Sequence, residues 1–216
     1  MKDRNLKAFI LAICFILTFI IWTVLVYFID VQEIGPRGSA IGIATINGYI
    51  HNVIGVHMTL YVIIDWLSLI PIGFCLAFAV VGLAQWIKRK HILKVDFSIL
   101  ALGIFYIIVF GIYVVFEFVV VNYRPVLIDG FLQASYPSST TMLVLCIIPT
   151  ALFQFNRFIK NNMLKKCVFT ALITFTIFMV VGRFVSGVHW FSDIIGGILI
   201  SAGLVTLYYS ILSVKR

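Results

Sequence analysis

The amino-acid sequence predicts an all-α, polytopic membrane protein: a bundle of six transmembrane helices with a candidate active-site pocket at its extracytoplasmic end. Three observations support this fold class. The 216 residues are 62% hydrophobic and only 11% charged, whereas about half of a soluble domain is apolar. Polar breaks divide the chain into six long apolar stretches. Basic residues are concentrated in alternate connections between these stretches.

The six apolar stretches have the lengths expected of membrane-spanning helices. They run from about residue 8 to 29, 58 to 87, 96 to 121, 139 to 155, 167 to 182 and 191 to 213. About 20 residues of helix cross the hydrocarbon core, so the ends of the short fourth and fifth stretches are the hardest to place. The first stretch has about 22 residues and no small-residue cleavage site follows it. Because the core of a signal peptide has about 7 to 15 residues, we interpret this stretch as the first helix.

The basic residues predict the sidedness of the chain. Thirteen of the sixteen Lys and Arg residues precede the first stretch, separate the second from the third or the fourth from the fifth, or follow the sixth. The other three are Arg37, Arg124 and Arg183. By the positive-inside rule, both termini are cytoplasmic and these three arginines are extracytoplasmic, in what we expect to be the plasma membrane. The net charge of +8 follows from this asymmetry and does not indicate nucleic-acid binding.

No linker, soluble segment or internal repeat divides the chain, so we expect a single transmembrane domain, residues 1–216. The longest segment outside the spans, residues 30 to 57, mixes apolar and polar positions and predicts a short amphipathic helix at the outer interface. Asp65 lies inside the second stretch, where an acid is either functional or pairs within the bundle. The four cysteines lie in or beside apolar stretches without CxxC spacing, which favours small buried hydrophobic residues.

Two arginines lie at the predicted outer ends of separate spans. Arg124 closes the third span and Arg183 closes the fifth, so their guanidinium groups can converge. Such a pair suits a phosphate, because the planar guanidinium donates paired hydrogen bonds to its oxygens. A Ser/Thr run at residues 138–141 opens the fourth span, where first-turn N–H groups can bind an anion. The alternative is that this run only caps the helix.

His189 and Asp193 are four residues apart and would share one face of a helix. A carboxylate that accepts a hydrogen bond from one imidazole nitrogen fixes the tautomer, and the other nitrogen can then act as nucleophile or base. The alternative is a purely structural histidine. A metal site is not predicted, although His51 and His57 are also on the outer side. The histidines lack HExxH or comparable spacing, and two arginines would repel a divalent cation.

Three motifs, within residues 117–193, resemble those of the type 2 phosphatidic acid phosphatase and vanadium haloperoxidase superfamily, in its integral-membrane branch of six-helix lipid phosphatases. The family motifs are KxxxxxxRP, PSGH and SRxxxxxHxxxD. This chain reads EFVVVNYRP at 117–125, PSST at 137–140 and GRFVSGVHWFSD at 182–193. Their order and spacing agree with the family, and all three fall at predicted outer ends of spans.

The resemblance implies a lipid phosphatase that needs no metal or other cofactor and acts on a phosphoester or diphosphate lipid of the bilayer. His189 would attack phosphorus to form a phosphohistidine, and Asp193 would orient it. The substrate-binding residues that the resemblance implies are Arg124, Arg183, Ser138, Ser139 and Thr140. The expected partners are the lipid substrate and the bilayer itself.

The motifs depart from the family at three positions. Gly182 replaces a serine, Glu117 replaces the phosphate-binding lysine, and Thr140 replaces the histidine that protonates the leaving oxygen. Glu117 should weaken phosphate binding. Thr140 cannot act as a general acid, and loss of such an acid typically costs about 100-fold to 10,000-fold in rate. Activity is therefore expected to be reduced.

Three hypotheses address these departures. The first is a preference for lipid diphosphates, such as undecaprenyl diphosphate, over monoesters such as phosphatidic acid, because a leaving phosphate needs a proton less than an alkoxide does. The second is that His51 or His57 supplies the missing acid. The third is a catalytically impaired relative that binds or translocates phospholipid.

Overall fold

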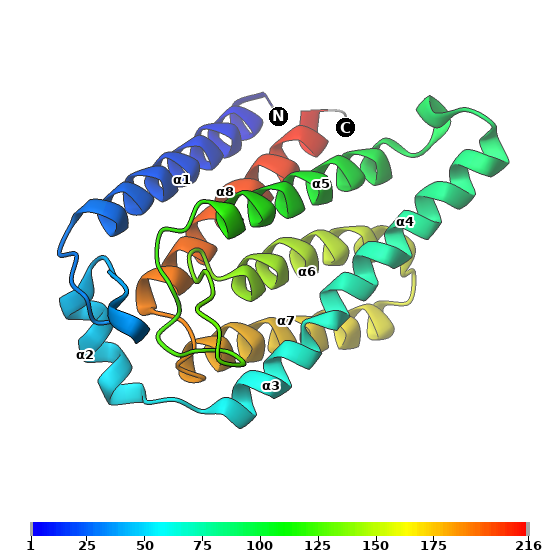
Figure 1. Ribbon diagram of the computed structural model, residues 1–216. Coiled ribbons are helices and arrows are strands. Elements are labelled where there is room, and N and C mark those ends of the chain that lie inside the picture. Colours follow the sequence, from blue (N-terminus) through cyan, green and yellow to red (C-terminus); the bar gives the residue numbers. More distant parts are fainter. Residues whose placement is uncertain (1, 215–216) are drawn as a thin grey trace.

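The computed structural model describes the backbone of residues 2–214 and the side chains of residues 5–213. Its α-helices are α1 (Lys2–Phe28), α2 (Ala44–Ile54), α3 (Met58–Leu67), α4 (Leu69–Arg89), α5 (Phe97–Phe118), α6 (Ser139–Phe158), α7 (Asn162–Val185) and α8 (Phe191–Val214), with short 3₁₀ helices η1 (Pro36–Gly38) and η2 (Ile92–Lys94) (Figure 1). Lys215 and Arg216, which the charge pattern assigns to the cytoplasm, lie outside the described residues.

Six helical stretches of the described chain are long and apolar enough to cross a membrane. They are Asn5–Phe28, Met58–Arg89, Phe97–Phe118, Ser139–Phe158, Asn162–Val185 and Phe191–Ser213. The chain is therefore an integral membrane protein, and the predicted all-α class with six spans is confirmed.

The helix ends differ from the apolar stretches where local hydrogen bonds decide them. The fifth span begins near residue 162 rather than 167, because the side chain of Asn161 accepts hydrogen bonds from the N–H groups of Met163 (2.9 Å) and Leu164 (3.1 Å). This cap starts the helix before its two lysines. The second span consists of α3 and α4, which are separated at Ser68. Pro71 explains the break, since it has no N–H to donate and its ring crowds the carbonyl four residues earlier.

Helices α6 and α8 form the interior of the bundle. In their most apolar windows 56% and 50% of the residues are buried, against 28% or less in the other spans. α1 packs most extensively on α8, and α6 packs on both α7 and α8. α5 packs against α4, α6 and α8, while α3 packs against α7. Polar groups at the N-terminal ends of α6 and α8 are therefore shielded by the surrounding helices.

The connections are sorted between the two ends of the bundle. α2 and the segments 119–138 and 186–190 lie together at one end. The start of α1, the end of α8 and the α4–α5 and α6–α7 connections lie at the other (Figure 1). The short helix predicted in the first connection is α2, which lies outside the six spans. It exposes Tyr49 (72%) and Val53 (69%), as suits a helix at a membrane interface.

The segment between α5 and α6 folds back on itself as an irregular hairpin. Its tip is Asp129 and Gly130, whose φ angles are 50° and 79°. Two successive residues with positive φ make the tight turn that matches the twist of paired strands, and Asp-Gly is a preferred sequence for it. The N–H of Arg124 donates to the carbonyl of Gln133 at 3.0 Å, which places the two arms side by side.

The turn between α7 and α8 is fixed by a close backbone approach. Gly187 has φ +68°, and a Cβ there would lie 1.9 Å from the carbonyl oxygen of Gly55. The N–H of His57 also donates to the carbonyl of Ser186 at 3.0 Å. The α2–α3 connection thus holds the segment that carries His189.

Candidate active site

A cavity of about 300 Å³ lies at the end of the bundle that carries α2. It is bounded by the end of α5, the hairpin segment, the start of α6 and the turn before α8. Its lining residues are Tyr113, Phe116, Glu117, Arg124, Gln133, Ala134, Ser135, Tyr136, Pro137, Ser139, Met142 and His189. All three sequence motifs therefore contribute side chains to one cavity.

His189 lies between α7 and α8, with only 4% of its surface exposed. Its Nδ1 is 3.1 Å from the carbonyl oxygen of Ser135, while Nε2 is buried and has no hydrogen-bond partner among the described residues. Burial lowers the pKa of His189 well below its ordinary value, and the positive charges of Arg183 and Arg124 lower this pKa further. The imidazole is therefore neutral near pH 7, with Nε2 free to act as a nucleophile.

Two guanidinium groups lie close to the same aromatic ring. The Cζ atoms of Arg183 and Arg124 are 5.0 Å and 6.0 Å from the centre of the Tyr61 ring, which comes from α3. In both arginines, Nε and Nη1 are buried and lack hydrogen-bond partners among the described residues. Arg183 is 1% exposed, and its nearest acid, Asp65, lies 3.9 Å from Nη1. Unpaired donors in a positive cluster provide what a phosphate requires.

This position of Asp65 supports the interpretation that the acid pairs within the bundle. Its side chain is 58% exposed, so the contact with Arg183 neutralises the guanidinium only partly. The attraction of the arginine pair for an anion is therefore retained.

Asp193 is fully buried beside His189, but the two side chains are joined through a third residue. Asp193 Oδ2 is 3.6 Å from His189 Nδ1, which is longer than a hydrogen bond. The same oxygen lies 2.5 Å from the hydroxyl of Ser135 and accepts the N–H of Trp190 at 2.9 Å. Asp193 therefore lies beside His189 without a direct hydrogen bond, and Ser135 contacts both side chains.

The Ser/Thr run at the start of α6 divides between interior and cavity. Ser138 is fully buried, its N–H donates to the carbonyl of Asp193 (3.0 Å), and its hydroxyl is hydrogen-bonded to that of Thr141 (3.0 Å). Thr140 is buried and is absent from the described cavity lining. Ser139 lines the cavity, so it is the member of the expected set that faces a bound group.

The charge reversal at Glu117 lies inside the cavity. Glu117 is exposed at the end of α5, and among the described residues it forms no ion pair with Arg124 or Arg183. Its negative charge thus faces any phosphate that enters.

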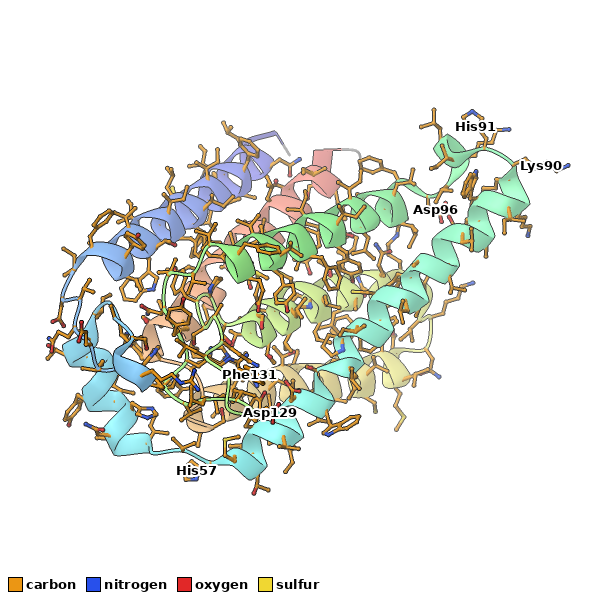
Figure 2. All side chains as sticks on the ribbon, in the orientation of Figure 1. His57, Lys90, His91, Asp96, Asp129 and Phe131 are labelled. Carbon is orange, nitrogen blue, oxygen red and sulfur yellow. The ribbon has the colours of Figure 1, made fainter. Side chains whose placement is uncertain are left out.

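The two other extracytoplasmic histidines lie outside the described cavity lining. The ring of His51 packs 5.2 Å from that of Trp190, and Nε2 of His57 is 3.0 Å from the carbonyl oxygen of Ile54. Figure 2 shows His57 at the base of α3, at the surface. The hypothesis that one of these histidines supplies the missing acid stays a prediction. Within residues 2–214, no three His, Cys, Asp or Glu side chains gather as a metal-ligand set.

A buried polar network secures α2 to the start of α8. Asn47 of α2 donates to the hydroxyl of Ser192 (2.9 Å) and accepts the N–H of the same serine (3.0 Å). The side-chain oxygen of Asn122 accepts the N–H of Gly42 at 3.0 Å. These residues fix the neighbours of Asp193, and the motifs did not indicate them.

Comparison with known proteins identifies the family. Residues 117–216 match the family model of the PAP2 superfamily. This region of the chain belongs to the PAP2 superfamily. Its first matched residue is Glu117, so the match includes all the motif residues of the cavity. Tyr61 and Asp65 come from the part of this chain that precedes the match.

The fold resembles that of a transmembrane PAP2 type phosphatidylglycerolphosphate phosphatase from Bacillus subtilis, solved by crystallography. The TM-score is 0.53 at 16% sequence identity, over 95% of this chain and 96% of that chain. Such a likeness shows the fold. A search of curated proteins finds no match to the sequence.

Proposed function

We propose that this PAP2 protein is a phosphatase that hydrolyses a phosphoester or diphosphate of a membrane lipid through a phosphohistidine on His189. The observation that carries the proposal is a set of buried nitrogens without hydrogen-bond partners among the described residues: Nε2 of His189, and Nε and Nη1 of Arg124 and Arg183. Both arginines lie over the Tyr61 ring, and their charges act on His189. A neutral nucleophile beside two fixed cations matches the requirements of phosphoryl transfer, in which charge spreads over the phosphoryl oxygens.

The reaction follows from this arrangement in two steps. Nε2 forms a bond to phosphorus, the bond to the leaving oxygen breaks, and that oxygen departs with the electron pair. Water then attacks the phosphohistidine and releases orthophosphate, which regenerates the imidazole. The arginines supply the positive charge in both steps, so the proposal does not require a metal ion.

The cavity lies at the end of the bundle that the basic residues assign to the extracytoplasmic side. We therefore place the reaction at the outer leaflet of the plasma membrane, with both termini in the cytoplasm. Phe116 and Met142 give the cavity an apolar wall beside its polar groups. A lipid can then enter between helices with its tail in the bilayer and its phosphate beside Arg124.

The substrate is proposed to be a diphosphate lipid of the polyprenyl diphosphate class. Thr140 is buried and His189 is the histidine of the described cavity lining, so an alkoxide leaving a monoester lacks an imidazole to protonate it. The purified protein should release phosphate from polyprenyl diphosphate about tenfold to 100-fold faster than from phosphatidic acid at equal concentration. Equal or faster release from phosphatidic acid contradicts this preference.

Glu117→Lys should strengthen substrate binding. Reversing the charge in the cavity replaces repulsion of the phosphate by attraction. We expect this to lower KM about tenfold, since two charges a few ångströms apart near a protein surface interact by a few kcal/mol. Steady-state phosphate release measures the change. Glu33→Lys is the matched control, because Glu33 is exposed and is not part of the described cavity lining. An unchanged KM in Glu117→Lys would show that residue 117 does not face the bound phosphate.

The alternative function is binding or translocation of phospholipid without turnover. It is favoured by the position of Glu117 in the cavity and of Thr140 away from it. Incubation with lipid labelled on the terminal phosphate, followed by alkaline denaturation, distinguishes the two. Labelled phosphohistidine in the wild type and its loss in His189→Ala support the phosphatase, whereas saturable lipid binding without label on the protein supports the alternative.

A further inference from the structure

Ser135 is held rigidly at the centre of the site. It is 2% exposed, and its N–H donates to the carbonyl of Asn122 at 2.9 Å across the hairpin. Its hydroxyl oxygen is 3.0 Å and its carbonyl oxygen 3.1 Å from Nδ1 of His189. The same hydroxyl is 2.5 Å from Oδ2 of Asp193. One residue therefore contacts both the histidine and the acid.

The directions of these hydrogen bonds follow from the available protons. The hydroxyl of Ser135 donates to Oδ2 of Asp193, which also accepts the N–H of Trp190 at 2.9 Å. The single hydroxyl proton is then used, and toward His189 the serine can only accept. Its carbonyl oxygen can likewise only accept. Nδ1 therefore carries a proton, and the lone pair lies on Nε2, which is buried and has no hydrogen-bond partner among the described residues.

We infer that Ser135 is a positioning residue through which Asp193 acts on His189, an inference that rests on the proposed function. When Nε2 binds phosphorus, the imidazole ring becomes positively charged. The charge is stabilised by the Ser135 carbonyl and by its hydroxyl oxygen, whose electron density is increased by donation to Asp193. The proton stays on Nδ1 throughout, and no proton moves to Asp193.

A double-mutant cycle distinguishes two cases: Asp193 acts on His189 through Ser135, or Asp193 acts on His189 directly. Ser135→Ala removes the hydroxyl but keeps the carbonyl that fixes the tautomer, so kcat should fall about tenfold to 100-fold with KM within about twofold. Asp193→Asn should cause a similar loss in the wild type. In the Ser135→Ala background, Asp193→Asn should cost less than about threefold more, because the route is already broken. Losses that multiply would show that Asp193 acts independently of Ser135 and would overturn the inference.

Matched variants separate positioning from packing. Ser201→Ala removes another buried hydroxyl, hydrogen-bonded to Gly197 at 2.6 Å within α8, and should keep the wild-type kcat. Ser135→Thr keeps a hydroxyl and should recover most of the rate lost in Ser135→Ala. If Ser135→Ala does not fold, Ser135→Cys, whose thiol is a weak donor, takes its place in the cycle.

Different results contradict the proposed function and the role of Ser135. Turnover that survives in His189→Ala contradicts the proposed function, whatever the cycle shows. If His189→Ala is inactive but the kcat losses of Ser135→Ala and Asp193→Asn multiply in the double variant, only the role of Ser135 is contradicted. A wild-type kcat in Ser135→Ala has the same meaning. The pH dependence of kcat in Ser135→Thr should match that of the wild type.

Discussion

His189→Ala is expected to abolish lipid phosphate release, with a fall in kcat on the order of 10⁴-fold or more, as when the nucleophile of a covalent enzyme is removed. The variant lacks the atom that attacks phosphorus, while both arginines remain to bind the lipid phosphate. Lipid affinity should therefore change little. Phosphate release from polyprenyl diphosphate by the purified protein in detergent measures the first effect, and equilibrium lipid binding measures the second.

His91→Ala is the control for this variant. His91 is exposed at the opposite end of the molecule, near Lys90 and Asp96 (Figure 2), and its removal should leave kcat unchanged. The pH dependence provides a second check. The pKa of His189 is well below its ordinary value, so Nε2 keeps its lone pair above that lowered pKa and loses it only as the pH falls through it. Nε2 of His189 should remain unprotonated at pH 6, as measured by NMR of the imidazole nitrogens, and protonation of Nε2 at or above pH 6.5 contradicts the assignment.

Arg183→Ala is expected to lower kcat/KM by about 100-fold to 1,000-fold, the usual cost of removing one preorganised donor to a developing oxyanion. Arg183 is 1% exposed, and its Nε and Nη1 have no hydrogen-bond partner among the described residues. Little water can therefore reach this position to donate hydrogen bonds in place of the guanidinium. Steady-state kinetics with the same lipid measure the loss.

Arg183→Lys tests whether the planar guanidinium or only its charge is needed. Lysine keeps the charge but cannot donate the paired hydrogen bonds, so recovery should be partial. Arg37→Ala is the matched control at the same end of the bundle, since Arg37 is exposed and donates to the carbonyl of Gly130 at 3.1 Å. Wild-type kcat/KM in Arg183→Ala would contradict a phosphate site at this residue.

The sequence contained enough to predict the six spans and the position of the three motifs at one end of the bundle. Hydropathy is a local property of the chain, so it predicts the spans directly. The motifs lie at the ends of the third and fifth spans and the start of the fourth, which are on the same side of the membrane when successive spans alternate in direction. Ser135 could not be found in this way, because its contacts join residues 54 and 58 positions apart through a hairpin. The Asp129-Gly130 pair was the available signal for that turn.

Other features depended on packing that sequence patterns do not record. The residue at which α6 starts was predictable, but the rotation of the helix about its own axis, which decides which side chains face the cavity, was not. That rotation follows from the hydrogen bond of Ser138 to the backbone of Asp193, which turns Ser139 and not Ser138 toward the cavity. Tyr61 is one aromatic residue in an apolar span, and nothing in its sequence context distinguishes it from the lipid-facing residues around it.

The closeness of Arg124 and Arg183 at the Tyr61 ring has a consequence for turnover. Folding holds two like charges close together before any anion binds, so the two guanidinium groups repel each other. Any dianion that enters relieves this repulsion, and orthophosphate, the last product to leave, does so as well as the lipid does. The feature that favours capture of the substrate therefore also slows the departure of the product, and free orthophosphate competes with the lipid for the site.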